Sequence, residues 1–340
     1  MYKNIAPFGI SVIICTHNRV KRLVPTLDVL EHQNTPPGLA WEILVIDNGS
    51  TDDTFKVADE FRKKLKKNIE FRIIYEPVLG KSNALVRGYN EANYELMLVC
   101  DDDNWLQPEY LKTVAEIFKE NPEIGLLGGY GIADFGEEKT PEWFVKWQQF
   151  YACGKHHDKS GFLKQGDVSI WGAGSVIRKT LWVFLRNNGF HFINNTGPGT
   201  MFGEDVELAH AIAFSGCQLY FDERLWYHHD LSRRQITKES LKMQVKNSGS
   251  SLFPIYSIAY KNSPDKINRY CITFVRMLIS MLINLFIQSL KKNNKATRKY
   301  LLVQFIGLLI NMRKNKKLYR EIFPWMSRIK NSFPLKGEIL

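Results

Sequence analysis

The chain has 340 residues, 44% of them hydrophobic, and carries a formal net charge of +11 at pH 7. This length is sufficient to bury a large core and to hold more than one domain. The five cysteines are odd in number and form no close-spaced pairs, which argues against a disulfide framework or a zinc site and indicates a reducing compartment.

Strand and helix patterns alternate over the first hundred residues. Apolar segments predict strands at 10–15, 41–46, 71–75 and 94–100. The segments between them predict helices at 20–32, 52–67 and 83–92. Such alternation predicts βαβ units and a mostly parallel sheet flanked by helices, which defines an α/β fold. Ligands of open parallel sheets bind beyond the carboxyl ends of the strands, so the residues that follow each strand are candidates for a site.

Three adjacent aspartates, Asp101, Asp102 and Asp103, follow the fourth predicted strand. Adjacent carboxylates repel each other, and they are costly beside a core unless a cation or hydrogen-bond donors compensate them. The spacing of Asp101 and Asp103 suits a hard divalent cation that also holds substrate phosphates. An acidic turn that caps the next helix is the alternative. Asp47 ends the second strand and is expected at the same edge of the sheet.

Acidic residues also open a predicted amphipathic helix at 203–213. Glu204 and Asp205 lie in its first turn, where carboxylates interact favourably with the helix dipole, so capping is one explanation. The other is a general base, which must lie close to the hydroxyl that it deprotonates.

A pair of histidines, His228 and His229, follows a predicted edge strand at 218–227. Taken from the residues alone, the pair is a surface feature of a loop; its alternative, a part of a metal or diphosphate site, comes only from the family resemblance named below. Arg233 and Arg234, a few residues further on, are either bidentate ligands of phosphate oxygens or solvated side chains.

Five short motifs occur in one order along the chain, and together they resemble glycosyltransferase family 2, whose members have the nucleotide-sugar-binding GT-A fold. The motifs are Ser11–Arg19, Val45–Asp52, Gly80–Ala84, Asp101–Asp103 and Phe202–Leu208. The resemblance covers residues 9–235, about two thirds of the chain.

The resemblance implies a role for each matching residue. It implies that the donor nucleotide sugar is bound by Thr16, Asn18, Arg19, Asp47, Asn83, Asp101 and Asp102. It implies that Asp101 and Asp103, with His229, hold Mn²⁺ or Mg²⁺ on the diphosphate, where the metal acts as a Lewis acid. Asp205 matches the general base of an inverting displacement, with Glu204 as the alternate. Which of the three aspartates contacts metal is left open.

The acceptor site is expected within residues 140–175, where aromatic side chains are concentrated. Aromatic faces suit sugar rings, but a satellite core beneath a long loop is the better interpretation for most of them: Trp143, Phe144, Trp147, Phe150 and Tyr151. Trp171 is the best single candidate for an acceptor contact, because small residues follow it and allow a ligand to approach closely.

The net charge is confined to the C-terminal segment. Residues 1–290 contain 33 basic and 33 acidic side chains, whereas residues 291–340 contain 13 basic and 2 acidic ones. Two segments, 270–290 and 300–312, are broadly apolar with a narrow polar stripe, and a cluster of basic residues joins them.

An amphipathic hairpin lying on an anionic membrane leaflet accounts for both features of this tail. A nucleic-acid-binding arm would not need two broad apolar faces. A membrane span at 270–290 would carry the basic connector out of the cytosol and place Arg276 within the bilayer. Packing onto the catalytic domain or onto a partner is the remaining alternative.

These observations predict a catalytic domain at 1–240, a connector at 241–268 and a basic amphipathic helical tail at 269–340. The expected activity is inverting transfer of a sugar from a nucleotide diphosphate donor, a UDP-sugar, to a hydroxyl of a glycan or lipid-linked acceptor. This would serve polysaccharide or glycolipid biosynthesis on the cytoplasmic face of the membrane. The alternatives are a nucleotide-sugar-binding protein without turnover and a nucleotidyltransferase.

Overall fold

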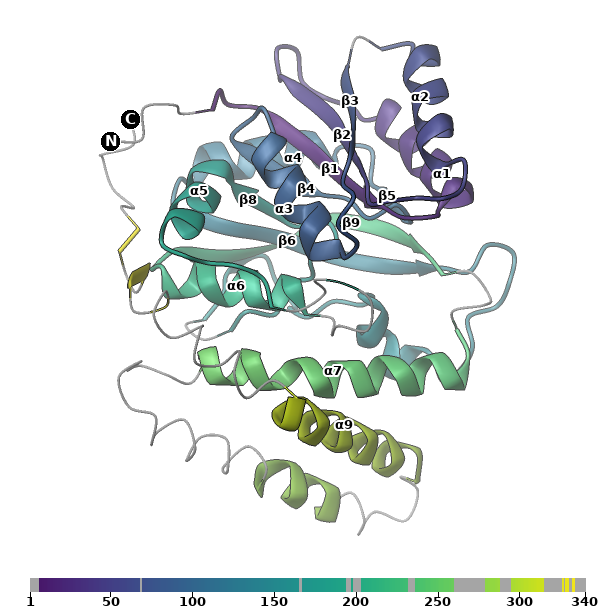
Figure 1. Ribbon diagram of the computed structural model, residues 1–340, viewed down its shortest axis with the longest axis vertical. Helices are drawn as coiled ribbons and strands as arrows, with labels where there is room; N and C mark the ends of the chain where they lie inside the picture. The colour runs from purple at the N-terminus through teal and green to yellow at the C-terminus, as the bar shows by residue number, and fades with distance from the viewer. Residues whose placement is uncertain are drawn as a thin grey trace.

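The computed structural model describes residues 6–67, 69–164, 167–193, 197, 203–231, 236–259, 279–287, 295–314, 326, 328–329 and 332–333. Within these ranges the centre of the molecule is a mixed sheet of nine strands, shown with its helices in Figure 1. The strands are β1 (Ile10–Thr16), β2 (Trp41–Asp47), β3 (Glu70–Tyr75), β4 (Leu96–Val99), β5 (Asn104–Leu106), β6 (Ile124–Asp134), β7 (Gly161–Phe162), β8 (Val176–Arg178) and β9 (Gln218–Asp230).

The strand order is β3-β2-β1-β4-β8-β6-β9-β5, and β7 pairs with β9. The first four strands are parallel to one another, as predicted from their alternation with helices. β8 runs antiparallel to both β4 and β6, and β5 runs antiparallel to β9. The sheet is therefore parallel in its N-terminal half and mixed in its C-terminal half.

The helices are α1 (Val20–Glu31), α2 (Thr54–Lys64), α3 (Lys81–Glu91), α4 (Tyr110–Glu120), η1 (Val145–Tyr151), α5 (Lys179–Asn187), α6 (Glu204–Phe214), α7 (Lys238–Ala259) and α9 (Lys295–Lys314). Two cores form because successive side chains of a strand point to opposite faces. Ile13 of β1 packs with α3, α5 and α6 on one face. Val12 and Ile14 pack with α1, α2 and α4 on the other. Burial on both faces explains why these strands are nearly continuous apolar runs.

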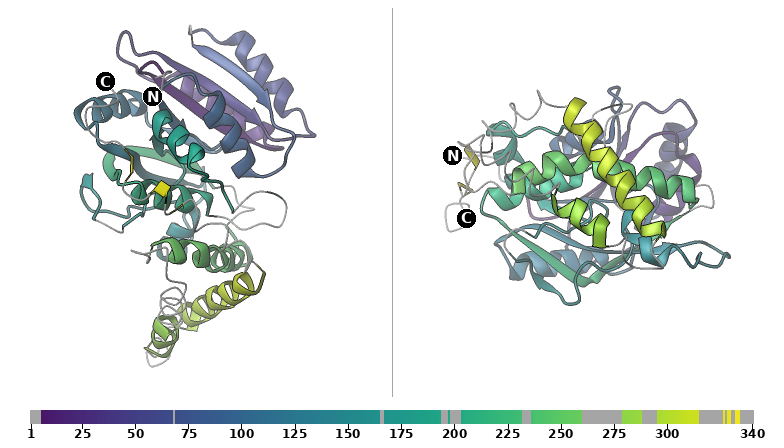
Figure 2. Two further views of the ribbon diagram at one scale, coloured as in Figure 1. Left: turned by 60° about the vertical axis from the view of Figure 1, so that its left-hand side comes forward. Right: turned by 90° about the horizontal axis from the view of Figure 1, so that it is seen from below.

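A third apolar cluster joins the aromatic segment to the C-terminal helices. Phe144 and Tyr151 are buried against Leu241 and Val245 of α7 and Tyr300 of α9. The ring centroids of Trp147 and Tyr300 lie 4.7 Å apart, and the two ring planes are inclined at 63°. Most of the aromatic residues of this segment thus form a satellite core, as predicted. Figures 1 and 2 show α7 and α9 stacked beside the sheet domain.

The predicted tail is described in part. Residues 279–287 and α9 are helical, whereas the rest of the predicted segment at 270–290 lies outside the described residues. None of the helices in the described ranges is long and apolar enough to cross a membrane. α7 runs across the predicted boundary at residue 240, so the division into three parts stays a prediction. Cys15, Cys100, Cys153 and Cys217 are free thiols, and Cys271 lies outside the described residues.

Candidate active site

A cleft of about 720 Å³ opens at the carboxyl ends of β1 and β4. Most of the predicted site residues line it, although they come from five separate parts of the chain: Thr16, Arg19, Asp101, Asp102, Asp103, Trp171, Glu204, Asp205 and His229. The strand-end rule therefore located the cleft, since β1 and β4 are neighbours in the sheet.

The three aspartates have different environments. Asp102 is the most buried, at 8% exposed, and its Oδ2 accepts a 2.7 Å hydrogen bond from the Thr16 hydroxyl. Its backbone carbonyl accepts a second hydrogen bond from Thr26 on α1. Burial and the neighbouring charge of Asp103 raise the pKa of Asp102 to about 7. Asp102 thus ties the acidic turn to β1 and α1, while Asp101 and Asp103 present their carboxylates to the cleft.

Asp101 is paired with Lys81, the first residue of α3. The Lys81 Nζ lies 2.7 Å from the Asp101 Oδ1 and 3.8 Å from the Glu204 Oε1. Burial would lower the pKa of Lys81, but the charges of Asp101 and Glu204 hold it well above its usual value. Lys81 was not predicted as a site residue, although it lies in the quoted motif Gly80–Ala84. Only the fold reveals that α3 begins beside β4 and α6.

Asp103 is compensated by two other cations. Its Oδ2 lies 2.7 Å from Arg22 of α1, and its Oδ1 lies 3.5 Å from the His229 Nε2. The His229 Nδ1 donates a 2.9 Å hydrogen bond to the Tyr151 carbonyl, which fixes the ring. Burial would lower the pKa of His229, but its contact with Asp103 raises that pKa to about 10. In the absence of other ligands, His229 and Asp103 therefore form a buried ion pair.

The ligating side chains of Asp101, Asp103 and His229 suit a divalent cation that binds together with a nucleotide diphosphate. A histidine that donates one ring N–H to a carbonyl and directs its other nitrogen into a site has the orientation of a metal ligand, and His229 has it. Over the described ranges, however, no three acidic, histidine or cysteine side chains converge on one point that could hold a metal. Mg²⁺ is commonly bound by one or two carboxylates together with substrate phosphates. Asp101 and Asp103 suit that arrangement rather than a preformed cage.

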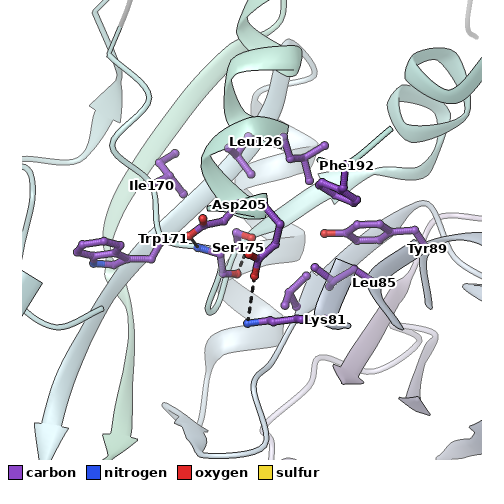
Figure 3. Close-up of a pocket in the computed structure, with 13 residues that line it drawn as sticks. Lys81, Leu85, Tyr89, Leu126, Ile170, Trp171, Ser175, Phe192 and Asp205 are labelled. Atoms are coloured by element: carbon purple, nitrogen blue, oxygen red, sulfur yellow. Dashed lines mark hydrogen bonds and ion pairs between the residues drawn. The ribbon is translucent and has the colours of Figure 1, made fainter. Parts of the chain in front are cut away.

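Asp205 lies on the opposite wall of the cleft, in the first turn of α6. Its Oδ2 accepts a 3.1 Å hydrogen bond from the Gly172 N–H, and its Oδ1 accepts one from the Val206 N–H. Burial and the charge of Glu204 raise the pKa of Asp205 to about 6. Figure 3 shows Asp205 between Trp171 and Tyr89, with Ser175 and Lys81 close by.

Gly172 has a steric reason to be glycine. A Cβ at this position would lie 2.8 Å from the Asp205 Cβ, so a side chain would displace the carboxylate. Trp171 precedes it and lines the same cleft. The Trp171 ring lies 3.9 Å from that of His156, and its indole nitrogen has no hydrogen-bond partner among the described residues. Trp171 is thus placed beside the predicted base.

Three predicted donor contacts do not line the cleft. The Asn18 Oδ1 accepts hydrogen bonds from the N–H groups of Thr51 and Asp52. The Asp47 Oδ1 accepts one from the Ser50 N–H, and the Asn83 Nδ2 donates one to the Leu79 carbonyl. These side chains shape the loops that follow β2 and β3. Arg233 and Arg234 lie outside the described residues.

The C-terminal helix α7 supplies a further wall that the sequence did not reveal. Gln244, Asn247 and Ser248 line the cleft opposite the sheet. No motif marks these residues, because their place depends on the packing of α7 onto the aromatic segment.

The comparisons with known proteins agree with this geometry. The family model described as Glycosyl transferase family 2 matches residues 11–181, half of the chain. The chain belongs to glycosyl transferase family 2 and is a glycosyltransferase.

Relatives of known activity match part of the chain. It is 32% identical over 122 residues to a poly-beta-1,6-N-acetyl-D-glucosamine synthase of Staphylococcus epidermidis, covering 36% of this chain and 28% of the relative. It is 31% identical over 121 residues to a dolichol-phosphate mannosyltransferase of Pyrococcus furiosus, covering 36% of this chain and 33% of the relative. The chain therefore matches about a third of the length of these relatives.

Solved structures share the fold. The mannosyltransferase PcManGT from Pyrobaculum calidifontis, in complex with GDP-Man and Mn²⁺, superposes with a TM-score of 0.55 at 15% identity over 90% of both chains. S. aureus TarS 1–349 in complex with UDP superposes with a TM-score of 0.50 at 17% identity over 92% of both chains. At these identities the likeness shows the fold alone, and that fold is the GT-A type.

Proposed function

We propose that the protein transfers one sugar from a nucleotide diphosphate donor, a UDP-sugar, to a hydroxyl of a glycan or lipid-linked acceptor, with inversion at the anomeric carbon. The observation that carries this proposal is the convergence of Asp101, Asp103 and Asp205 on one cleft. Two of these carboxylates suit the diphosphate side of a donor. The third has the burial and pKa of a base.

Donor binding is assigned to the wall formed by the ends of β1 and β4. Asp101 and Asp103 would hold Mn²⁺ or Mg²⁺ on the diphosphate. When bound, the metal would stabilise the charge that develops on the departing nucleoside diphosphate. Arg19 and Lys81 line the same wall and add positive charge where that group leaves.

Acceptor activation is assigned to Asp205. With a pKa of about 6, its carboxylate is mostly ionised at neutral pH and still accepts a proton readily. The Gly172 and Val206 N–H groups hold its two oxygens in place. The acceptor oxygen attacks the anomeric carbon as the bond to the diphosphate oxygen breaks, and its proton passes to Asp205. A single in-line displacement inverts the configuration.

The names of the relatives support a glycan or lipid-linked acceptor, since they include a poly-N-acetylglucosamine synthase and a dolichol-phosphate mannosyltransferase. A structural neighbour was solved with UDP and another with GDP-Man and Mn²⁺, which supports testing both nucleotides with metal. The test incubates the full chain with UDP- and GDP-sugars, Mn²⁺ or Mg²⁺, and a panel of saccharide and polyprenyl-phosphate acceptors.

A sugar transferase releases nucleoside diphosphate and forms product of inverted anomeric configuration. Release of pyrophosphate from a nucleoside triphosphate would instead identify a nucleotidyltransferase. Tight donor binding without release of nucleotide under any condition would identify a binding protein without turnover.

We also propose that the C-terminal helices rest on the inner face of an anionic membrane. Tyr300 and Val303 of α9 pack toward the aromatic segment. Leu302, Ile306 and Leu309 recur at helical spacing on another face of α9 and are more than 40% exposed. The helix at 279–287 exposes a further apolar row: Ile279, Leu282, Ile283, Phe286 and Ile287.

Exposed apolar rows beside basic residues fit a helix that lies in a lipid interface. The first turns of α9 carry Lys295, Arg298 and Lys299. Lys299 is exposed, so anionic lipids would attract its charge. A lipid-linked acceptor would then reach the cleft from the membrane side.

A further inference from the structure

A second cavity, of about 390 Å³, lies where the end of α1 meets β5 and β9. Trp105 and Trp226 line it, together with Asp28 and His32. Both tryptophans are half-buried, so each side chain is partly exposed. The volume falls within the range of about 300–1,000 Å³ that small-molecule sites occupy.

This cavity is separate from the catalytic cleft, although the same strands form both. β5 and β9 are antiparallel, with Trp105 opposite His228 and Asn104 opposite His229. Because successive side chains of a strand point to opposite faces, His229 lies in the catalytic cleft while Trp226 and His228 line the second cavity. The rings of Trp226 and His228 stand at right angles, 5.3 Å apart.

The chemistry of the walls selects one class of ligand. Indole rings offer flat apolar faces that suit the C–H face of a sugar ring, and Leu106 continues the apolar surface. Asp28 and His32 also line the cavity, and they supply polar groups of the kind that the hydroxyls of a sugar ring need as partners. Among the described residues that line this cavity there is no lysine or arginine. It therefore lacks the cations that a phosphorylated or acidic glycan would require.

The position of the cavity connects it to the reaction. β5 is the last strand of the sheet, and Trp105 follows Asp103 by two residues. A glycan chain that passes around this edge would contact both faces of the β5–β9 pair. One end would lie at the catalytic cleft and a distal unit at the two tryptophans.

We propose that this cavity is a second saccharide-binding site, which holds a distal unit of an uncharged glycan acceptor while the acceptor end reacts at Asp205. The acceptor role rests on the proposed function, whereas saccharide binding by the cavity does not. The site would make the enzyme favour long acceptors over short ones.

The first test measures binding without catalysis. The full-length Asp205→Asn protein is titrated calorimetrically with neutral hexasaccharides of glucose, mannose and N-acetylglucosamine, and with the corresponding monosaccharides. A hexasaccharide should bind, and Trp226→Ala in the same background should weaken it at least tenfold. Trp226→Tyr, which keeps an aromatic face, should retain most of the affinity.

Two further variants serve as a specificity control and as a second test of the cavity. Phe162→Ala removes another exposed aromatic that pairs with β9 outside the cavity, and it should leave the affinity unchanged. Asp28→Ala, on the exposed surface of α1, should weaken binding without disturbing the fold. Asp28→Ala thus keeps the proposal testable if Trp226→Ala fails to fold.

The second test uses the active enzyme. For a hexasaccharide acceptor, Trp226→Ala should raise KM about tenfold and leave kcat unchanged, whereas for a monosaccharide acceptor both should stay unchanged. The proposal is overturned if no hexasaccharide of the panel binds, or if Trp226→Ala binds like the parent protein. It is also overturned if the substitution only dissociates a dimer, since the cavity would then be an interface between copies. Saccharide binding without any sugar transfer would count against the proposed function alone.

Discussion

The Lys81 ammonium group lies 2.7 Å from the Asp101 carboxylate and thereby joins the two walls of the cleft. The same nitrogen lies 3.8 Å from Glu204, which precedes the predicted base. One cation thus compensates carboxylates that the chain places more than a hundred residues apart. It holds the turn that carries Asp101 close to the start of α6.

The first prediction concerns the metal. Asp101→Asn should lower kcat/KM on the order of 100-fold, because it removes one of the two carboxylates that would hold the cation. Mn²⁺ binding, measured by electron paramagnetic resonance in the presence of UDP, should weaken in parallel. Asp59→Asn, on the surface of α2, is the matched control and should change neither quantity. Full activity of the parent enzyme in excess chelator would refute the metal assignment.

The second prediction concerns the base. Asp205→Asn should lower kcat by about 10²–10⁴-fold, because an amide cannot accept the acceptor proton. Donor affinity, measured by calorimetry, should stay within about threefold, since a proton acceptor acts in the transition state and not in donor binding. Glu204→Gln changes the neighbouring carboxylate in the same way and should cost much less. If Glu204→Gln loses more activity than Asp205→Asn, the base is Glu204.

Much of this site was predictable from strand ends, and the reason is topological. β1, β2 and β4 are buried on both faces, so their apolar runs are easily recognised, and parallel strands bring their final residues to one edge. Asp101, Asp103 and Thr16 follow from that rule. Asp205 and His229 came from family resemblance, because nothing local shows that α6 and β9 face the same edge.

Other features were not predictable, because they depend on contacts between distant segments. Lys81 and Arg22 look like ordinary basic residues of amphipathic helices, and their pairing with the aspartates appears only after folding. β5 is three residues long and directly follows the acidic turn, so no periodic pattern marked it. The order of the predicted segments along the chain does not indicate that β8 lies antiparallel between β4 and β6.

The third prediction concerns pH. The base must be ionised, so kcat/KM should fall about tenfold per pH unit below the pKa of Asp205, which is about 6. Burial raises this pKa most, and the charge of Glu204 adds to it. Glu204→Gln removes that charge, so its acid limb should move to lower pH. The measurement is a pH–rate profile of both enzymes at saturating metal. An acid limb at the same pH in both would show that Glu204 does not act on the titrating group.

The fourth prediction concerns the tail, and it is better tested by point substitution than by truncation. Because Tyr300 packs on Trp147, removing α9 would expose the aromatic cluster and confuse loss of membrane contact with loss of fold. Ile306→Gln changes a residue that is 44% exposed and therefore leaves this packing intact. Burying an isoleucine in an apolar phase contributes about 1.5–3 kcal/mol. The variant should therefore partition at least about tenfold less strongly onto anionic liposomes in a sedimentation assay.

Salt separates the two contributions to this binding. Exposed charges are screened at high ionic strength, so Lys299→Gln should weaken binding at low salt and have little effect at high salt. The effect of Ile306→Gln should persist in both conditions, because apolar burial is not screened. Val145→Gln serves as the control, since Val145 is 61% exposed and belongs to η1 and not to either apolar row. If Ile306→Gln and Val145→Gln sediment like the parent protein, the exposed row of α9 does not contact lipid and the membrane proposal fails.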